Sequence, residues 1–229
     1  MKSDAFDLDS FGGTVRLFPL PDFVLFPHVV APLHIFEPRY RQMTADALGR
    51  DRLLALVLLK PGFEADYEAA PPIHRMACLA QIIQDEKLAD GKYNLLVRGL
   101  CRVRLEKELP TEKLYRLAQS RPAPDVDQRA LPEYRQELQE ATLPLLHQLS
   151  PAIEQMKALF QSPLPLGSLC DVLSFALPIS TDSKQALLGQ LDIEQRARRL
   201  IHELKSGTLP EVLPRPREGW KFPPEFSPN

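Results

Sequence analysis

The hydrophobic pattern of the chain changes from strand-like in its first half to helix-like in its second half. Between Leu17 and Met43 the sequence LFPLPDFVLFPHVVAPLHIFEPRYRQM is rich in aromatic and β-branched residues, but five prolines interrupt it. Proline cannot donate a ladder hydrogen bond, so long central strands are excluded here. We therefore predict a first strand over residues 14–20 and short strands that meet at bends over residues 23–36.

A helix is predicted directly after these bent strands. Pro38 suits the first helical position, where its missing N–H has no consequence. Behind it, Tyr40, Met43 and Ala47 fall on one face at helical spacing. Gly49 is predicted to end this helix in the left-handed conformation.

The clearest strand signal is a hairpin. Asp90-Gly91 separates two strand-like runs, 76–88 and 93–105, and this dipeptide is typical of a two-strand turn. In the second run the odd-numbered residues are predicted to face inward, and the even-numbered ones, Arg102 among them, to face outward. Because the alternation continues past Gly99, we predict a bend or bulge there that keeps the strand in the sheet.

Two more strands complete the predicted sheet. The continuous apolar run over residues 52–59 predicts a strand buried on both faces. A last strand is expected near residues 114–119. Residues 14–121 are therefore predicted to form one closed or nearly closed β-barrel with a single helix.

From residue 125 the apolar period becomes helical. Five helices are predicted. The first covers about 128–149, with Pro144 as a kink or an early end, and the second begins at Ser150-Pro151. The third covers 166–177, the fourth 180–188 with Ser180 or Thr181 as cap, and the fifth begins at Leu191 with Asp192 as cap. Six prolines in the last segment predict an extended tail. The predicted segments are thus 14–121, 125–205 and 206–229.

The proline-bent stretch resembles the opening of the Lon protease N-terminal, substrate-recognition domain. Pro19-Leu20, Phe26-Pro27 and Pro32-Leu33 match the rhythm of that opening. The segments 97–103 and 176–204 resemble later parts of the same family, so the resemblance covers roughly residues 15–205. It is strongest to bacterial proteins that carry this domain with no ATPase or peptidase attached.

The resemblance implies an α+β fold. Its N-terminal part is a β-barrel of the pseudouridine-synthase-and-archaeosine-transglycosylase (PUA-like) kind, followed by a helical bundle packed on it. It also implies binding of exposed apolar segments of client polypeptides, in the role of an adaptor or regulator of proteolysis, with a Lon-type protease as a further partner. An extended peptide would dock on a barrel edge or between barrel and bundle.

Composition narrows the partners and the compartment. The 229 residues are 44% hydrophobic and 25% charged, with a net charge of −2, which argues against a general nucleic-acid partner. Three cysteines far apart in the sequence indicate reduced thiols, not a disulfide framework or a zinc site. The N-terminus lacks the pattern of a signal peptide, and no apolar run reaches the roughly 20 residues that span a membrane. We expect a cytoplasmic protein with no membrane partner.

The sequence offers no catalytic constellation. A Walker A loop needs two glycines five residues apart, and none of the ten glycines meets this spacing. A G-x-S-x-G nucleophile elbow is also absent. His28 and His34 could approach Cys78 or Cys101 to hold a metal, but hydrogen bonding within the barrel wall is the favoured interpretation. We predict no enzyme activity, no cofactor and no metal.

Candidate binding residues lie in the proline-bent stretch. Aromatic side chains there are favoured as core, yet bent strands can leave some of them on an exposed groove. We predict that Phe26, Phe36, Arg39 and Tyr40 contact a bound peptide. The competing interpretation pairs Arg39 with Glu37 within the chain.

Two other functions are alternatives to peptide binding. PUA-like barrels in other families bind RNA, which here predicts a positive face built from some of Arg98, Arg102, Arg104, Arg196 and Arg199. Arg196, Arg198 and Arg199 form a basic cluster on the predicted last helix, for which a solvated face is the default. A small-molecule hydrolase or ligand sensor would need a deep pocket with convergent His or Glu, and nothing in the sequence indicates one.

Overall fold

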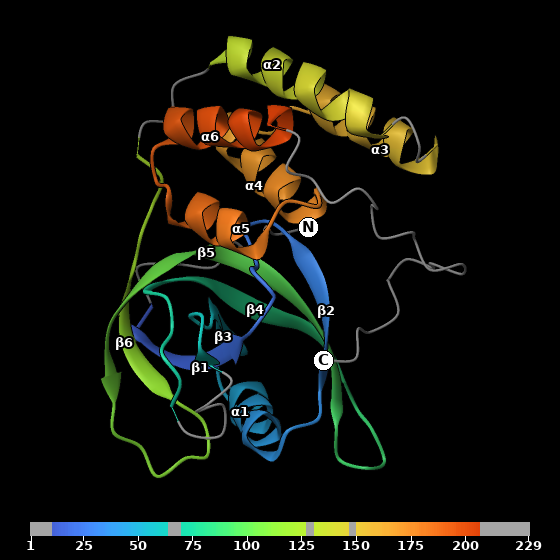
Figure 1. The fold of residues 1–229 in the computed structure, drawn as a ribbon. Coiled ribbons are helices and arrows are strands. Elements are labelled where there is room, and N and C mark those ends of the chain that lie inside the picture. The colour runs from blue at the N-terminus through green and yellow to red at the C-terminus, as the bar shows by residue number, and fades with distance from the viewer. Residues whose placement is uncertain (1–10, 64–69, 127–130, 147–149, 207–229) are drawn as a thin grey trace. The chain divides into compact units, whose positions relative to one another are not determined.

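The computed structural model describes residues 11–63, 70–126, 131–146 and 150–206. These residues fall into two compact units, which divide between Ala123 and Pro124 (Figure 1). The first unit contains the strands and one helix, and the second contains the remaining helices. The α+β class predicted from the sequence is therefore confirmed.

The first unit is built on a six-stranded sheet. Its elements are β1 (Thr14–Leu20), β2 (Val30–Ile35), α1 (Pro38–Leu48), β3 (Leu53–Leu58), β4 (Met76–Lys87), β5 (Tyr93–Leu109) and β6 (Leu117–Pro122). The strand order is β2-β5-β4-β3-β1-β6, with β1 parallel to β3 and the other pairs antiparallel. Because β6 also pairs with β5, the pairings run through β1, β3, β4, β5 and β6 and return to β1.

The second unit is helical. Its elements are α2 (Pro132–Thr142), the 3₁₀ helix η3 (Leu143–Leu146), α3 (Ser150–Gln161), α4 (Leu166–Ala176), α5 (Thr181–Gly189) and α6 (Ile193–Lys205). Two helix starts follow the predicted capping chemistry. The Ser180 hydroxyl accepts from the Ser183 N–H, and the Asp192 carboxylate accepts from the Gln195 N–H.

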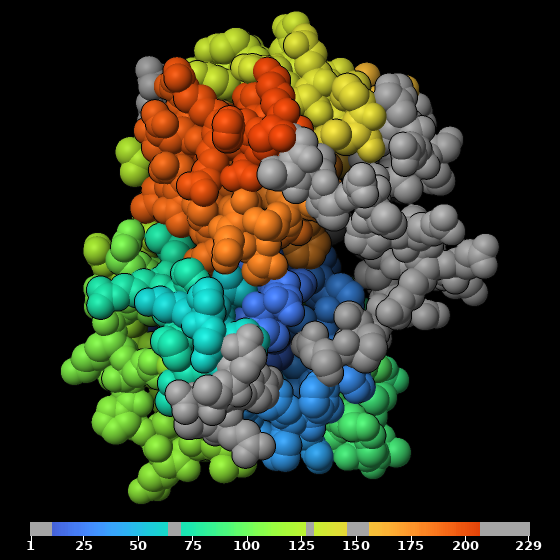
Figure 2. Space-filling model, viewed as in Figure 1, coloured from blue at the N-terminus to red at the C-terminus, as the bar shows by residue number. Residues whose placement is uncertain are grey.

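The core of the first unit is centred on β3, whose six residues are all buried, as the continuous apolar run predicts. Its odd-numbered residues belong to one cluster of buried side chains with members from β1, β4, β5 and β6. Elsewhere in this unit, α1 packs against β1, where the rings of Tyr40 and Phe18 lie 4.6 Å apart. Side chains fill the spaces between the ribbons of each unit (Figure 2).

The predicted hairpin and its bulge are confirmed. Strands β4 and β5 pair on either side of the Asp90-Gly91 turn, in which Gly91 has a φ of 81°. The β4–β5 register shifts where Gly99 and Cys101 face consecutive residues of β4, which makes Leu100 the extra residue of a bulge.

Several predicted boundaries are wrong. Of residues 23–36 only Val30–Ile35 form a strand, and β6 begins at Leu117, three positions after the expected start. The helix predicted over 128–149 ends early, which is one of the two outcomes expected at Pro144: α2 ends at Thr142 and Pro144 lies in a 3₁₀ turn.

The predicted left-handed cap at Gly49 is also wrong. Gly49 has a φ of −76°, and the left-handed residue is Arg52, with a φ of 60°. The predicted tail, except for Ser206, lies outside the described residues.

Candidate functional site

One part of the sheet extends beyond the circuit of strand pairings, and we call it the outer sheet. It consists of β2, residues 93–98 of β5 and residues 82–87 of β4. In the described chain, β5 is the one strand that pairs with β2, so β2 forms an edge (Figure 1).

The two faces of the outer sheet differ sharply in exposure. Ala31, Leu33 and Ile35 of β2, together with Leu95 and Val97 of β5, are at most 3% exposed. The alternate residues of the same strands point the other way. This second face, the outer face, carries residues that are partly or largely exposed: Val30, Pro32, His34, Asn94, Leu96 and Arg98.

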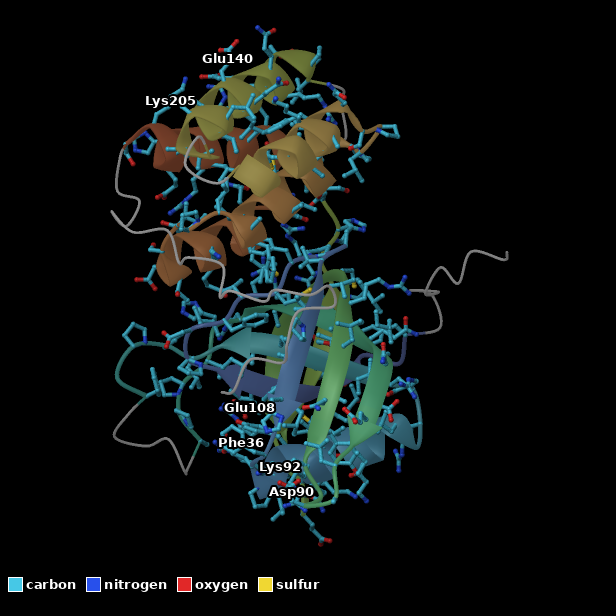
Figure 3. The ribbon with its side chains drawn as sticks, turned by 90° about the vertical axis from the view of Figure 1, so that its right-hand side faces the viewer. Phe36, Asp90, Lys92, Glu108, Glu140 and Lys205 are labelled. Carbon is cyan, nitrogen blue, oxygen red and sulfur yellow. The ribbon has the colours of Figure 1, made fainter. Side chains whose placement is uncertain are left out.

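The outer sheet gathers exposed apolar side chains. Among the described residues five large hydrophobic side chains are exposed, and three of them lie on the outer sheet or directly beside it: Val30 (38%), Phe36 (37%) and Ile83 (39%). Ile83 is the extra residue of a second bulge, in β4. Phe36 follows β2 directly and lies at the same end of the sheet as the turn residues Asp90 and Lys92 (Figure 3). Such a surface suits an apolar segment of a partner chain.

A row of polar side chains crosses this surface between Leu96 and Phe36. His34, Asn94 and Glu86 are directly opposite one another across the three strands. The Asn94 amide nitrogen donates to Glu86 over 3.0 Å, which leaves the amide oxygen to accept from His34 Nδ1 over 2.8 Å. Further along β5, Arg98 donates to the Gln81 amide oxygen over 3.3 Å. The hydrogen bonds hold these polar side chains in place, so the outer face has a defined shape.

Two of the four predicted peptide-binding residues lie in the core. Phe26 is fully buried and Tyr40 is 5% exposed, so neither ring is offered to a peptide in this structure. The backbone of Phe26 lies close against Gly99 of β5. Phe36 is exposed and its ring stacks on His34, with centroids 6.3 Å apart.

Arg39, the fourth predicted residue, is half-buried and has partners within the chain. Its guanidinium lies 2.8 Å from Glu37 and 4.6 Å from the centre of the Tyr40 ring. The ion pair is the competing interpretation weighed from the sequence. Roles in peptide binding stay predictions for all four residues, Phe26, Phe36, Arg39 and Tyr40.

Val30, Leu96 and Ile83 were not singled out from the sequence. The adjacent pair Ile82-Ile83 indicates an outward-facing apolar side chain, because in a strand two neighbouring residues point to opposite faces. Ile82 is buried and Ile83 exposed. Leu96 lies on the side of its strand that the alternation predicts to face outward. For Val30, exposure depends on the sheet order, which local sequence does not specify.

The proposed basic face loses two of its five arginines. Arg102 is 4% exposed and Arg196 is fully buried, so their predicted outward positions are wrong. Arg196 forms ion pairs with Asp125 and with Asp171, the latter at 2.9 Å. These paired carboxylates explain how a guanidinium is accommodated inside the second unit.

The sequence left open a metal site built from histidine and cysteine. In the described part of the chain, no three His, Cys, Asp or Glu side chains are grouped as metal ligands would be. Cys78 and Cys170 are buried. Burial raises the pKa of the Cys101 thiol to about 11, although the charge of Arg102 acts in the opposite direction, so this thiol is protonated at neutral pH. No helix in the described residues has the length and apolar character needed to cross a membrane.

Comparison with known proteins identifies the class to which this fold and surface belong. Residues 14–206 match the family described as the ATP-dependent protease La (LON) substrate-binding domain. The chain therefore belongs to the LON substrate-binding domain family, and the resemblance stated from the sequence is confirmed. The matched domain is a substrate-binding module and not the catalytic protease domain.

Individual relatives agree with this assignment. The chain is 29% identical over 191 residues to the Lon protease of Syntrophus aciditrophicus (strain SB), a match that covers 80% of this chain and 24% of the relative. It is also 29% identical over 192 residues to the Lon protease of Xanthomonas oryzae pv. oryzae, with 81% and 22% covered. The chain thus spans about a quarter of the length of these curated relatives.

Solved structures share the fold. The N-terminal domain of Mycobacterium avium complex Lon protease aligns with a TM-score of 0.65 at 18% identity, covering 86% of this chain and all of the other. A Lon N-terminal domain protein from Xanthomonas campestris aligns with a TM-score of 0.61 at 21% identity, covering 82% and 96%. At these identities the likeness supports the fold alone.

Proposed function

We propose that this chain is a non-catalytic module that binds exposed segments of client polypeptides and acts as an adaptor or regulator of proteolysis, with a Lon-type protease as a further partner. Membership in a substrate-binding family supports a binding role. In this chain, the observation that supports the proposal is the concentration of exposed apolar side chains on and beside the outer sheet.

The chemistry of that surface favours polypeptide over RNA. Val30, Phe36 and Ile83 offer apolar area, whose removal from water supplies affinity for an apolar segment. An RNA site needs a continuous run of cations, and burial of Arg102 and Arg196 removes two of the arginines proposed for it.

We also propose that residues 14–121 form a PUA-like β-barrel domain and that residues 125–205 form a helical bundle. The circuit of strand pairings through β1, β3, β4, β5 and β6 supports the barrel. The division of the described residues between Ala123 and Pro124 supports the boundary.

Fluorescence anisotropy of the full chain with a labelled, permanently unfolded polypeptide tests the binding role. Reduced, carboxymethylated α-lactalbumin is a suitable probe, and the native protein is its folded control. We expect saturable binding of the unfolded form alone. Phe36→Ser removes the exposed ring next to β2 and is expected to weaken binding about fivefold or more, because partial burial of an aromatic side chain stabilises a complex by about 1 kcal/mol or more.

Leu114→Ser is the matched control. Leu114 is 63% exposed in the loop between β5 and β6, outside the outer sheet, so its loss is expected to leave affinity unchanged. Equal effects of the two substitutions would indicate non-specific hydrophobic adhesion. Absence of binding by the unsubstituted chain would reject the client-binding role.

A further inference from the structure

We propose that the client segment binds as an added β-strand along the open edge of β2, with its backbone hydrogen-bonded to Val30, Pro32 and His34. This inference rests on the proposed function and specifies how the client segment is bound. The bound chain is an extended stretch of another polypeptide.

The hydrogen-bonding pattern between β2 and β5 determines which backbone groups of β2 are free to bind another strand. Gly99 N–H donates to Val29 O over 2.8 Å. Hydrogen-bonded and non-hydrogen-bonded pairs alternate in an antiparallel ladder. With the observed register, Ala31, Leu33 and Ile35 therefore bond to β5, and the intervening residues point their N–H and C=O groups away from it. Pro32 is one of these, which fits because it has no N–H to give to β5.

Arg52 covers the opposite edge of the outer sheet at the point where that edge begins. Past Gln81 the free side of β4 meets Arg52, whose C=O accepts from Ile82 N–H and whose Nε donates to Ile82 O, both over 2.8 Å. The same guanidinium reaches Asp85 over 2.6 Å. Covering an exposed edge with a charged side chain is a common protection against strand addition. At β2 no such cover is present among the described residues.

Pro32 selects against a second copy of this chain as the occupant. A two-fold symmetric pairing of β2 with itself, centred on Pro32, places proline opposite proline. Neither has an N–H, so the central pair of hydrogen bonds is lost. An unrelated extended segment with an N–H at every position loses only one bond at the same place, so the edge favours a different chain.

Charge complementarity adds a preference at one end of β2. Arg98 lies directly opposite Val30 on the outer face, and its guanidinium donates to the neutral Gln81 amide. A carboxylate in the bound strand beside Val30 would meet the positive charge of Arg98. The favoured client is thus an extended apolar segment with an acidic residue near one end.

Backbone methylation of the ligand tests strand addition without altering the protein. The tightest short peptide is first selected from overlapping fragments of carboxymethylated α-lactalbumin. Versions N-methylated at one residue each are then titrated against the full chain. In an added strand every second N–H points to β2, so we expect losses of about tenfold or more at alternate positions and little change between them.

Pro32→Ala locates the added strand. The substitution supplies the missing N–H and is expected to tighten binding of the unmethylated peptide about two- to tenfold. Pro110→Ala is the control, at an exposed proline in the loop after β5, and is expected to have no effect. Arg98→Gln is expected to weaken a glutamate-containing peptide but not its glutamine counterpart.

The outcomes separate the two proposals. Failure of the unmethylated peptide and its parent polypeptide to bind would reject the proposed function. Binding without alternating sensitivity to methylation would reject strand addition and leave the proposed function standing. Alternating sensitivity with no response to Pro32→Ala would reject the β2 edge as the place of addition.

Discussion

Gly99 is important to the first unit because of the side chain that it lacks. Its C=O accepts from His28 N–H and its N–H donates to Val29 O, both over 2.8 Å, which binds the turn before β2 onto β5. His28 itself has a φ of 66°. A Cβ on Gly99 would lie 2.9 Å from the carbonyl carbon of Phe26 and closer still to its oxygen.

Gly99→Ala is therefore expected to lower the free energy of unfolding of the first unit by about 1–3 kcal/mol, because an overpacked contact with backbone cannot relax by side-chain rotation. Urea denaturation followed by circular dichroism measures the change.

Gly12→Ala is the control for this change. Gly12 lies in the same unit, and a Cβ there would meet nothing within 4 Å. Its effect is expected to stay within about 0.5 kcal/mol. Equal stability of the two variants would show that the turn can move away from β5.

Residue exposure was predicted well for apolar positions and poorly for two arginines. A pattern assigns charged residues to the surface because burying an unpaired charge is unfavourable. For Arg196 that argument fails, since its two carboxylate partners, Asp125 and Asp171, are 71 and 25 residues away in the sequence. Only the tertiary structure brings such distant partners together.

Elements with local signals were predicted, and the errors occur where a distant contact decides the backbone conformation. The hairpin of β4 and β5 is specified by its turn, and α6 by Asp192 and its apolar face. Residues 23–29 are apolar enough for a strand, yet their backbone turns against Gly99. Strand propensity is overridden there by a contact with β5.

In the second unit the helices are connected through buried charge. Arg196 of α6 reaches Asp171 of α4, and also Asp125 in the segment that precedes the helices. The same guanidinium donates to the backbone C=O of Gln190 over 3.0 Å. One side chain thus holds three stretches of chain together.

Arg196→Met is expected to lower the free energy of unfolding of the helical unit by about 3–5 kcal/mol, because it leaves two neighbouring carboxylates without their cation. Urea denaturation monitored at the helical circular dichroism band measures the effect. Adding Asp171→Leu to the variant is expected to recover part of the loss, since a buried unpaired charge is then removed.

Arg198→Met is the control on the same helix. Arg198 pairs with Glu194 at the surface, so a far smaller change is expected. Similar losses at the two positions would mean that burial of Arg196 does not decide its contribution.

At the scale of the whole molecule, the candidate site results from sheet order. From the sequence, Phe36 could be chosen as a surface aromatic, and docking on a barrel edge could be anticipated in general terms. The sequence could not predict which strand forms the edge, because β2 pairs with β5, about sixty residues later in the chain. The same order assigns Arg52 to the closed side of β4.

Pro32 has a second consequence for the whole molecule, since an open edge can pair with the same edge of another copy. In the symmetric arrangement, Pro32→Ala restores two central hydrogen bonds, which is worth about 1–3 kcal/mol, or about 5- to 150-fold in the dimerisation constant. We therefore expect Pro32→Ala to self-associate at lower concentration than the unsubstituted chain in sedimentation velocity, while Pro110→Ala behaves like the unsubstituted chain. Identical sedimentation of all three would mean that another part of the molecule covers β2, and that proline is not what keeps the edge free for a client.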